Sequence, residues 1–177
     1  IGTFALSGQS YSNGGVAWNS DNVAVGYRAL NANQPASTTS GTNNTAIGVF
    51  TMLNNTGASQ NVAIGNYALY SQAGYAVNNP PTNNVAVGFS ALYSNTPDGG
   101  AGAITNTAVG SYALQANTTA WGNTATGNEA MYSNTTGVWN TANGSDALSN
   151  NITGNGSTAI GAFALQSNTA SDNTAVG

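Results

Sequence analysis

The chain has 177 residues, 3% of them charged, and it contains neither cysteine nor histidine. Arg28 is its only basic side chain, against five acidic ones. This composition excludes phosphate neutralisation by a basic surface, disulfide bonds, thiolate or imidazole metal sites and histidine-based catalysis. No run of about 18 apolar residues is present, so we expect no membrane-inserted segment and no nucleic-acid partner.

One short motif recurs along the whole chain and sets the expected architecture. Its pattern is Asn-Thr-Ala-Val/Ile-Gly, followed after two residues by Ala-Leu, as in residues 106–114. The motif glycines are, in chain order, Gly2, Gly26, Gly48, Gly65, Gly88, Gly110, Gly127, Gly144, Gly161 and Gly177. Five of their spacings are 16 or 17 residues and four are 22 to 24. The repeat unit is therefore about 17 residues, with insertions in some copies.

Each motif predicts one short β-strand, because its β-branched residues alternate with small ones. A unit of about 17 residues is too short for a pair of helices but suits one coil of two short strands and two turns. The Ala-Leu segment is the expected second strand. We therefore predict an all-β fold, a parallel β-solenoid (β-roll) forming a single domain over residues 1–177. Since the chain starts and stops within a repeat, we expect it to be a window of a longer chain.

The insertions all follow the Ala-Leu pair, with examples at 34–42, 74–82 and 97–105. Insertions at one point of a repeat predict loops on one side of the solenoid. Proline and glycine in these segments favour loops, because both residues are poor in a strand ladder.

Strand alternation places Thr and Val/Ile on one face and Ala and Gly on the other. We expect the Val/Ile column to fill the coil interior together with the Leu/Met column. The Ala column would then face outward and allow close approach of another backbone, which predicts an oligomer. The expected oligomer seam consists of Ala24, Ala46, Ala63, Ala86, Ala108, Ala125, Ala142 and Ala159. The alternative is that Ala and Gly only fit a tight coil.

Two polar features accompany the repeat. An Asn or Gln recurs after each Ala-Leu pair, at Gln9, Asn33, Asn55, Gln72, Asn95, Asn117, Asn134, Asn151 and Asn168. These residues would either form turns or stack as amide ladders between coils. Thr126 and Asn143 replace the Val/Ile residue, and we expect them to form a polar layer covered by Trp121 and Trp139.

The repeat Asn-Thr-Ala-Val/Ile-Gly-x-x-Ala-Leu-x-Ser-Asn-Thr resembles the head repeats of trimeric autotransporter adhesins and repeats of bacteriophage tail-fibre proteins. The best matches are residues 61–72, 84–96 and 106–118. The resemblance implies a left-handed parallel β-roll, association of three chains, and a surface that binds a host or matrix. The units here are longer than usual adhesin head units, and no anchor or coiled-coil stalk is present in these residues.

Catalysis is not expected, and no cofactor or metal is implied. The acids are scattered singly, and five of them over nine coils cannot supply the ligands of a calcium-stabilised solenoid. Glu129 and Asp146 occupy the same repeat position in successive units and are interpreted as solvent-facing. No Ser/His/Asp set or phosphate loop is present.

Adhesion is the leading functional hypothesis, as part of an extracellular fibre at a cell or virion surface. Tyr70, Tyr93 and Tyr132 each follow the Leu/Met residue, and we expect them to be exposed and able to stack on a host glycan or contact a protein. The Phe residues after the glycines are expected to pack between coils or along the oligomer seam. One alternative is a purely structural filament or shaft spacer. Another is an ice-binding solenoid, disfavoured because its Thr column is expected to point inward.

Overall fold

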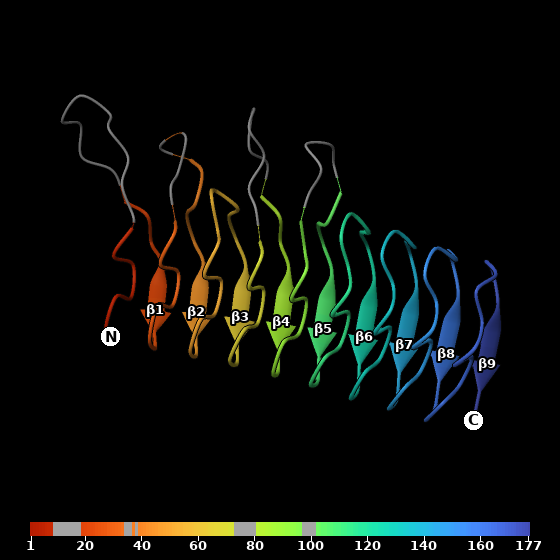
Figure 1. The fold of residues 1–177 in the computed structure, drawn as a ribbon. Coiled ribbons are helices and arrows are strands. Elements are labelled where there is room, and N and C mark those ends of the chain that lie inside the picture. The colour runs from red at the N-terminus through yellow and green to blue at the C-terminus, as the bar shows by residue number, and fades with distance from the viewer. Residues whose placement is uncertain (9–18, 34–36, 38, 73–80, 97–101) are drawn as a thin grey trace.

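The computed structural model describes residues 1–8, 19–33, 37, 39–72, 81–96 and 102–177. Of the predicted insertions 34–42, 74–82 and 97–105, residues 34–36, 38, 74–80 and 97–101 lie outside the described residues, as does Gln9. The described chain is an elongated rod with the two termini at opposite ends (Figure 1). It contains no helix long and apolar enough to cross a membrane.

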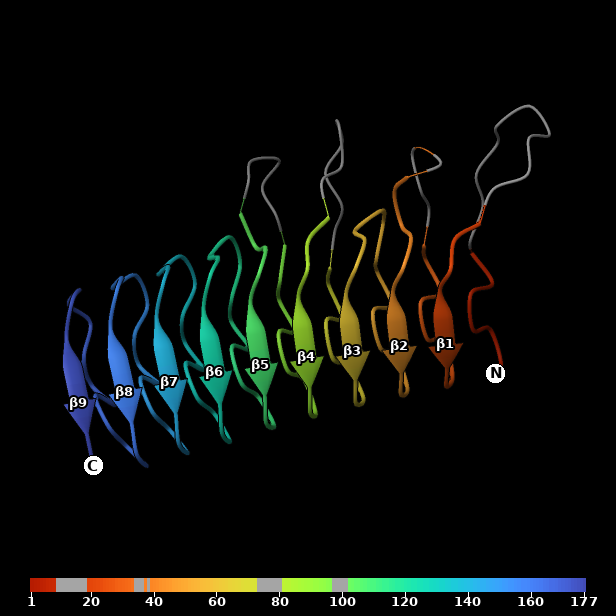
Figure 2. The ribbon, with the colours of Figure 1, turned by 180° about the vertical axis from the view of Figure 1, so that it is seen from behind.

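Nine three-residue strands lie side by side along the rod and form one parallel sheet in sequence order (Figures 1 and 2). They are β1 (Val23–Val25), β2 (Thr45–Ile47), β3 (Val62–Ile64), β4 (Val85–Val87), β5 (Thr107–Val109), β6 (Thr124–Thr126), β7 (Thr141–Asn143), β8 (Thr158–Ile160) and β9 (Thr174–Val176). Each central alanine pairs with the alanine of the next strand. The register is the same across 17-residue and longer units, which confirms the predicted parallel solenoid.

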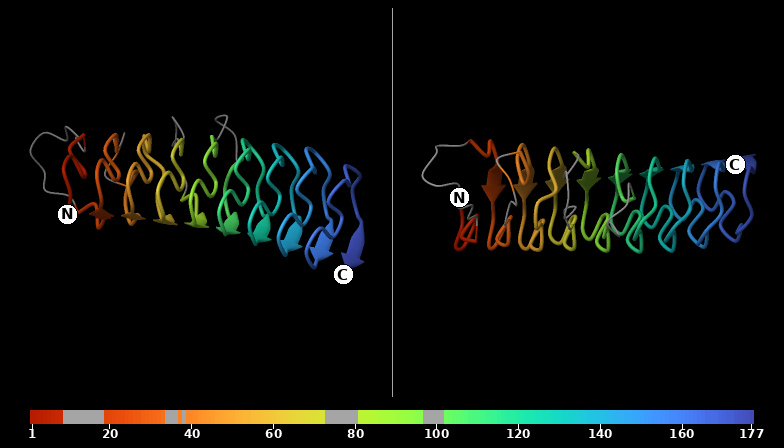
Figure 3. Two further views of the ribbon diagram at one scale, coloured as in Figure 1. Left: turned by 60° about the horizontal axis from the view of Figure 1, so that its bottom comes forward. Right: turned by 90° about the horizontal axis from the view of Figure 1, so that it is seen from above.

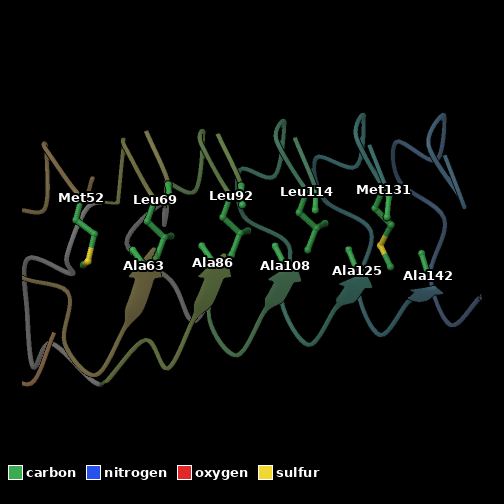
Figure 4. Close-up of a cluster of buried hydrophobic side chains, with 14 of the residues drawn as sticks. Met52, Ala63, Leu69, Ala86, Leu92, Ala108, Leu114, Ala125, Met131 and Ala142 are labelled. Carbon is green, nitrogen blue, oxygen red and sulfur yellow. The ribbon is translucent and has the colours of Figure 1, made fainter. Parts of the chain in front are cut away.

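The predicted orientation of the strands is wrong. The alanines point inward, and from Ala46 to Ala159 they are fully buried, whereas the flanking Thr, Val and Ile residues are exposed or half-buried. The alanines face the Leu/Met column within one chain, as Ala63 faces Leu69 and Ala86 faces Leu92 (Figure 4). A narrow coil with leucine on one wall leaves room for little more than a methyl group on the other.

The eight alanines of the predicted seam, Ala24, Ala46, Ala63, Ala86, Ala108, Ala125, Ala142 and Ala159, therefore belong to the core of the chain. They cannot line a contact with another chain, because their side chains are already covered. Any association of copies must therefore use a surface other than the alanine column.

The Ala-Leu segment is not a second strand. The second residue after each glycine and the following Leu or Met have positive φ, for example 61° at Tyr67 and 50° at Leu69. Alternation of left-handed residues with ordinary ones turns the backbone instead of extending it. The coils are nevertheless bonded here, since the Leu69 amide donates to the Ala91 carbonyl of the next coil at 3.0 Å.

Two columns of amide side chains run inside the rod. The predicted Asn/Gln column is buried and bonded between coils, with Asn117 Nδ2 donating to Asn95 Oδ1 at 2.7 Å and Asn151 Nδ2 to Asn134 Oδ1 at 3.0 Å. The amide-ladder alternative is thus confirmed for this column. These bonds join neighbouring coils without needing a charge, whereas Asn168 in the last coil is half-buried and donates to the Ala170 carbonyl of its own coil.

The second amide column was not predicted and consists of the asparagine before each strand, with Ser157 in its place before β8. Asn106 is typical: its Oδ1 accepts the Asn123 backbone amide at 3.0 Å, and its Nδ2 donates to the Ala120 carbonyl at 2.8 Å. The Asn117 amide of the first column reaches the same carbonyl at 3.2 Å. Both columns therefore bond the backbone of the segment that joins the Ala-Leu pair to the next strand.

The motif glycine allows the coils to approach closely at the end of each strand. At Gly65, which has a φ of 128°, an added Cβ would lie 2.5 Å from the Gly88 carbonyl oxygen of the next coil. No side chain fits there, and left-handed backbone of this kind suits glycine alone. The glycine column thus fixes both the turn and the spacing of the coils.

Candidate binding surfaces

The strands lie side by side along one side of the rod (Figure 3). The outer face of this sheet carries two columns of side chains, one from the first and one from the third residue of each strand. In β1 to β5 these residues are Val, Ile or Thr, and Val25, Ile47 and Ile64 are each exposed by nearly two fifths. No charged residue lies in either column. A continuous uncharged face with many exposed β-branched residues is unusual for a lone soluble chain.

The same face is most polar at β6 and β7, before Ile160 and Val176 return to the third position in β8 and β9. Thr126 and Asn143, expected as a buried polar layer, are exposed on this surface and need no internal partner. Trp121 and Trp139 precede β6 and β7, so they lie at the other end of these strands from Thr126 and Asn143. Their rings meet edge to face at 4.6 Å, and Trp139 is 61% exposed. The predicted covered layer is therefore wrong.

A second surface, here called the aromatic strip, follows the turn just after the strands. Its rings contact one another from coil to coil with centroids 5.3 to 6.2 Å apart. The strip consists of Phe4, Tyr27, Phe50, Tyr67, Phe89 and Tyr112. The sequence led us to expect that the Phe residues are buried, but Phe4 and Phe89 are exposed.

The three candidate tyrosines flank this strip. Tyr70 and Tyr93 are half-buried and stack face to face at 4.9 Å with an interplanar angle of 1°, while Tyr132 is exposed. Tyr67 touches both Tyr70 and Tyr93. The structure thus brings Tyr70 and Tyr93 together, and it places Tyr132 beside Tyr112 with ring centroids 6.4 Å apart.

The surroundings of Tyr93 shift the pKa of its phenol. Burial, and secondarily the neighbouring Tyr70 and Tyr67, raise the pKa of Tyr93 above its ordinary value of 10.0. Packing of several phenols side by side therefore favours the neutral hydroxyl, which can both donate and accept a hydrogen bond.

Tyr112, Glu129 and Tyr132 line a shallow open hollow of about 470 Å³ at the C-terminal end of the strip. Its carboxylate comes from the position that carries an aromatic ring in Tyr112, one coil earlier. At the other end of the strip the Arg28 guanidinium lies over the rings of Phe4 and Tyr27, at 5.7 and 5.5 Å from their centroids. The strip thus has an acidic hollow at one end and a cation at the other.

The described residues contain no cluster of three or more His, Cys, Asp or Glu side chains suited to a metal ion. Asp146 bonds its neighbour Ser145, whose Oγ donates to Asp146 Oδ2 at 2.9 Å. The prominent chemistry of these surfaces is aromatic and hydroxylic. No protein-family model, curated protein or solved structure matches the chain.

Proposed function

We propose that this chain is a structural and adhesive segment of an extracellular fibre, in which copies associate through the outer face of the sheet. The observation that carries the proposal is the uncharged outer face of all nine strands, made of Val, Ile and Thr except at Asn143. The resemblance of the repeat to adhesin heads and tail fibres implies that three copies associate and that the coil of each chain is left-handed.

A second copy of the chain is the occupant that best fits this face. Two columns of nine residues expose on the order of 1,000 Å² per copy, against roughly 800 Å² per partner in stable interfaces. A face without charge offers no electrostatic complementarity to a different protein. The same β-branched columns on two copies can instead interdigitate. Covering the face would also remove exposed Val and Ile from water.

The test is the mass of the purified protein by light scattering at several concentrations. We expect a stable oligomer, and Ile64→Glu to dissociate it into folded monomers, because the charge would be buried in the interface. Asn54→Glu is the matched control, since Asn54 is exposed in a turn outside the sheet face. A wild-type monomer at all concentrations, or equal effects of the two variants, contradicts association through this face.

Ice binding is the second candidate, and one observation favours it. The Thr column, expected to point inward, lies on the outer face, with Thr124, Thr141 and Thr174 exposed. Regularly spaced threonines on a flat sheet could order water along the rod. Thermal hysteresis in dilute solution tests this function: a measurable gap between melting and freezing supports it, and none excludes it in favour of the fibre.

A further inference from the structure

We propose that the aromatic strip is a binding platform for a neutral polysaccharide lying along the rod, anchored in the hollow between Tyr112, Glu129 and Tyr132. The inference deepens the proposed adhesive function, because it names the class of ligand that the fibre would hold.

The rings are not required by the fold. The second residue after the motif glycine has a left-handed φ of 53° to 61° in every coil from Phe4 to Phe163, a conformation that favours Gly or Asn. Ser90, Glu129 and Asp146 occupy this position as well, so the coil closes without an aromatic side chain. Aromatic residues at a backbone position that disfavours them point to a role outside folding.

The aromatic strip is also continuous in the coils where the aromatic residue occupies a different position of the repeat. In two coils this left-handed position holds Arg28 or Ser90, and the ring moves to the preceding residue, Tyr27 or Phe89. Tyr27 still contacts the rings before and after it at 6.2 and 5.3 Å, and Phe89 does so at 5.8 and 5.3 Å. An unbroken row is therefore maintained by two different local arrangements.

The geometry suits an extended chain of sugar residues. One ring per coil is offered at a spacing comparable to the length of one sugar unit, and the C–H faces of sugars stack on aromatic rings. Tyr27 and Tyr132 are each 39% exposed, so their rings are both supported by neighbours and accessible. Large rigid side chains of this kind bind with little loss of conformational entropy.

The hollow adds the polar contacts that orient a sugar. The Glu129 carboxylate can accept hydrogen bonds from hydroxyl groups, and the hydroxyls of Tyr112 and Tyr132 can donate or accept. A net charge of −4 with Arg28 as the only basic side chain disfavours acidic polysaccharides. A neutral glycan is therefore the ligand class that agrees with both the rings and the charge.

Affinity electrophoresis of the whole 177-residue protein tests the proposal, in native gels containing hydroxyethylcellulose, glycol chitin, laminarin or dextran, with alginate as the acidic comparison. We expect retardation by at least one neutral polymer and not by alginate. The double variant Tyr112→Asn/Tyr132→Ala should weaken binding about tenfold, since central aromatic anchors dominate such interfaces. Asn is chosen at position 112 because it tolerates left-handed backbone.

Phe163→Asn is the matched control. Phe163 has the same φ of 61° and is 60% exposed, but no ring of the described residues contacts it, so its loss should leave binding unchanged. Retardation by none of the neutral polymers overturns the proposal, as does an equal loss in the Phe163 variant. Competition by tetramethylammonium together with complete loss in Glu129→Gln also overturns it, because the hollow would then be a site for organic cations.

Light scattering on the same variants separates this inference from the proposed assembly. A strip variant that loses polysaccharide binding and keeps the wild-type mass supports the platform. If the wild type is a monomer that still binds the polymer, the assembly proposal fails and the platform stands. If Tyr112→Asn/Tyr132→Ala changes the mass, the strip is a contact between copies and the platform is rejected.

Discussion

The coils of β1 to β5 and those of β6 to β9 share one interior but present different surfaces. Both halves bury the same alanine, Leu/Met and asparagine columns. The first half exposes Val and Ile on the sheet and carries the aromatic strip, whereas the second exposes mostly Thr and holds Glu129 and Asp146 in place of rings. Since the fold is indifferent to these changes, the surface of each half reflects a demand other than folding.

Replacement of a motif glycine should give the largest effect, equally in both halves. Gly65→Ala and Gly144→Ala each drive a methyl group into the backbone of the next coil, so we expect a loss of roughly 3 kcal/mol or failure to fold. Thermal unfolding followed by circular dichroism measures it. Gly177→Ala is the control, because nothing lies within 4 Å of its added Cβ. A mild effect in one half alone would show that the interiors differ.

Removal of a buried asparagine side chain should give the next largest loss of stability. Asn123→Ala removes the acceptor of the Asn140 backbone amide, leaving that buried group unpaired, and removes one of the two side-chain donors to the Gly137 carbonyl. We expect a destabilisation of about 2–3 kcal/mol in urea unfolding. Asn128→Ala is the control, since Asn128 is exposed and makes one long bond of 3.3 Å. Equal stability of both variants would mean that the amide column contributes nothing.

Exchange of the two sheet surfaces should change assembly more than stability. Ile47→Thr/Ile64→Asn gives the first half the polarity of the second, and we expect about a tenfold weaker association. Thr126→Ile/Asn143→Ile makes the reverse change and should strengthen it, because both residues lie on the same outer face. Sedimentation over a concentration series measures the shift. A shift in the opposite direction, or no shift, would show that the copies do not associate through this face.

The smallest expected effect concerns Tyr93 in alkaline solution. Its raised pKa means that the folded chain holds the phenolic proton more tightly than the unfolded chain does. The stabilisation is fully present below pH 10.0, the ordinary value, and is lost as the pH rises through the raised pKa. Urea unfolding below and above that pH should show less loss in Tyr93→Phe than in the wild type. The same loss of stability in both proteins would show that groups other than Tyr93 cause the alkaline sensitivity.

The sequence predicts the solenoid, its repeat length and the buried Leu/Met column, because periodicity alone determines them. It does not determine which strand face is internal, since alternation defines two faces without ranking them. The distinguishing signal was present: the third strand residue varies between Ile64, Thr126 and Asn143, a range that a dry interior would not tolerate. The central residue is alanine in every strand.

The candidate site was predicted only in part. Tyr132 is exposed as expected, but the strip depends on contacts between Tyr27 and Phe50 or Phe89 and Tyr112, which occupy different repeat positions. An alignment of repeats puts such residues in separate columns, although the turn brings their rings together. Side-chain direction at left-handed positions is needed to find them.

The direction of the hydrogen bonds between coils has a mechanical consequence. These bonds run along the rod, as from the Leu69 amide to the Ala91 carbonyl. Tension applied to the two ends of the rod therefore pulls directly on the hydrogen bonds between successive coils. Coils would detach one at a time from a free end, and each would release roughly 60 Å of extended chain at nearly constant force. A fibre built this way yields in small steps under load and can rewind when the pull stops.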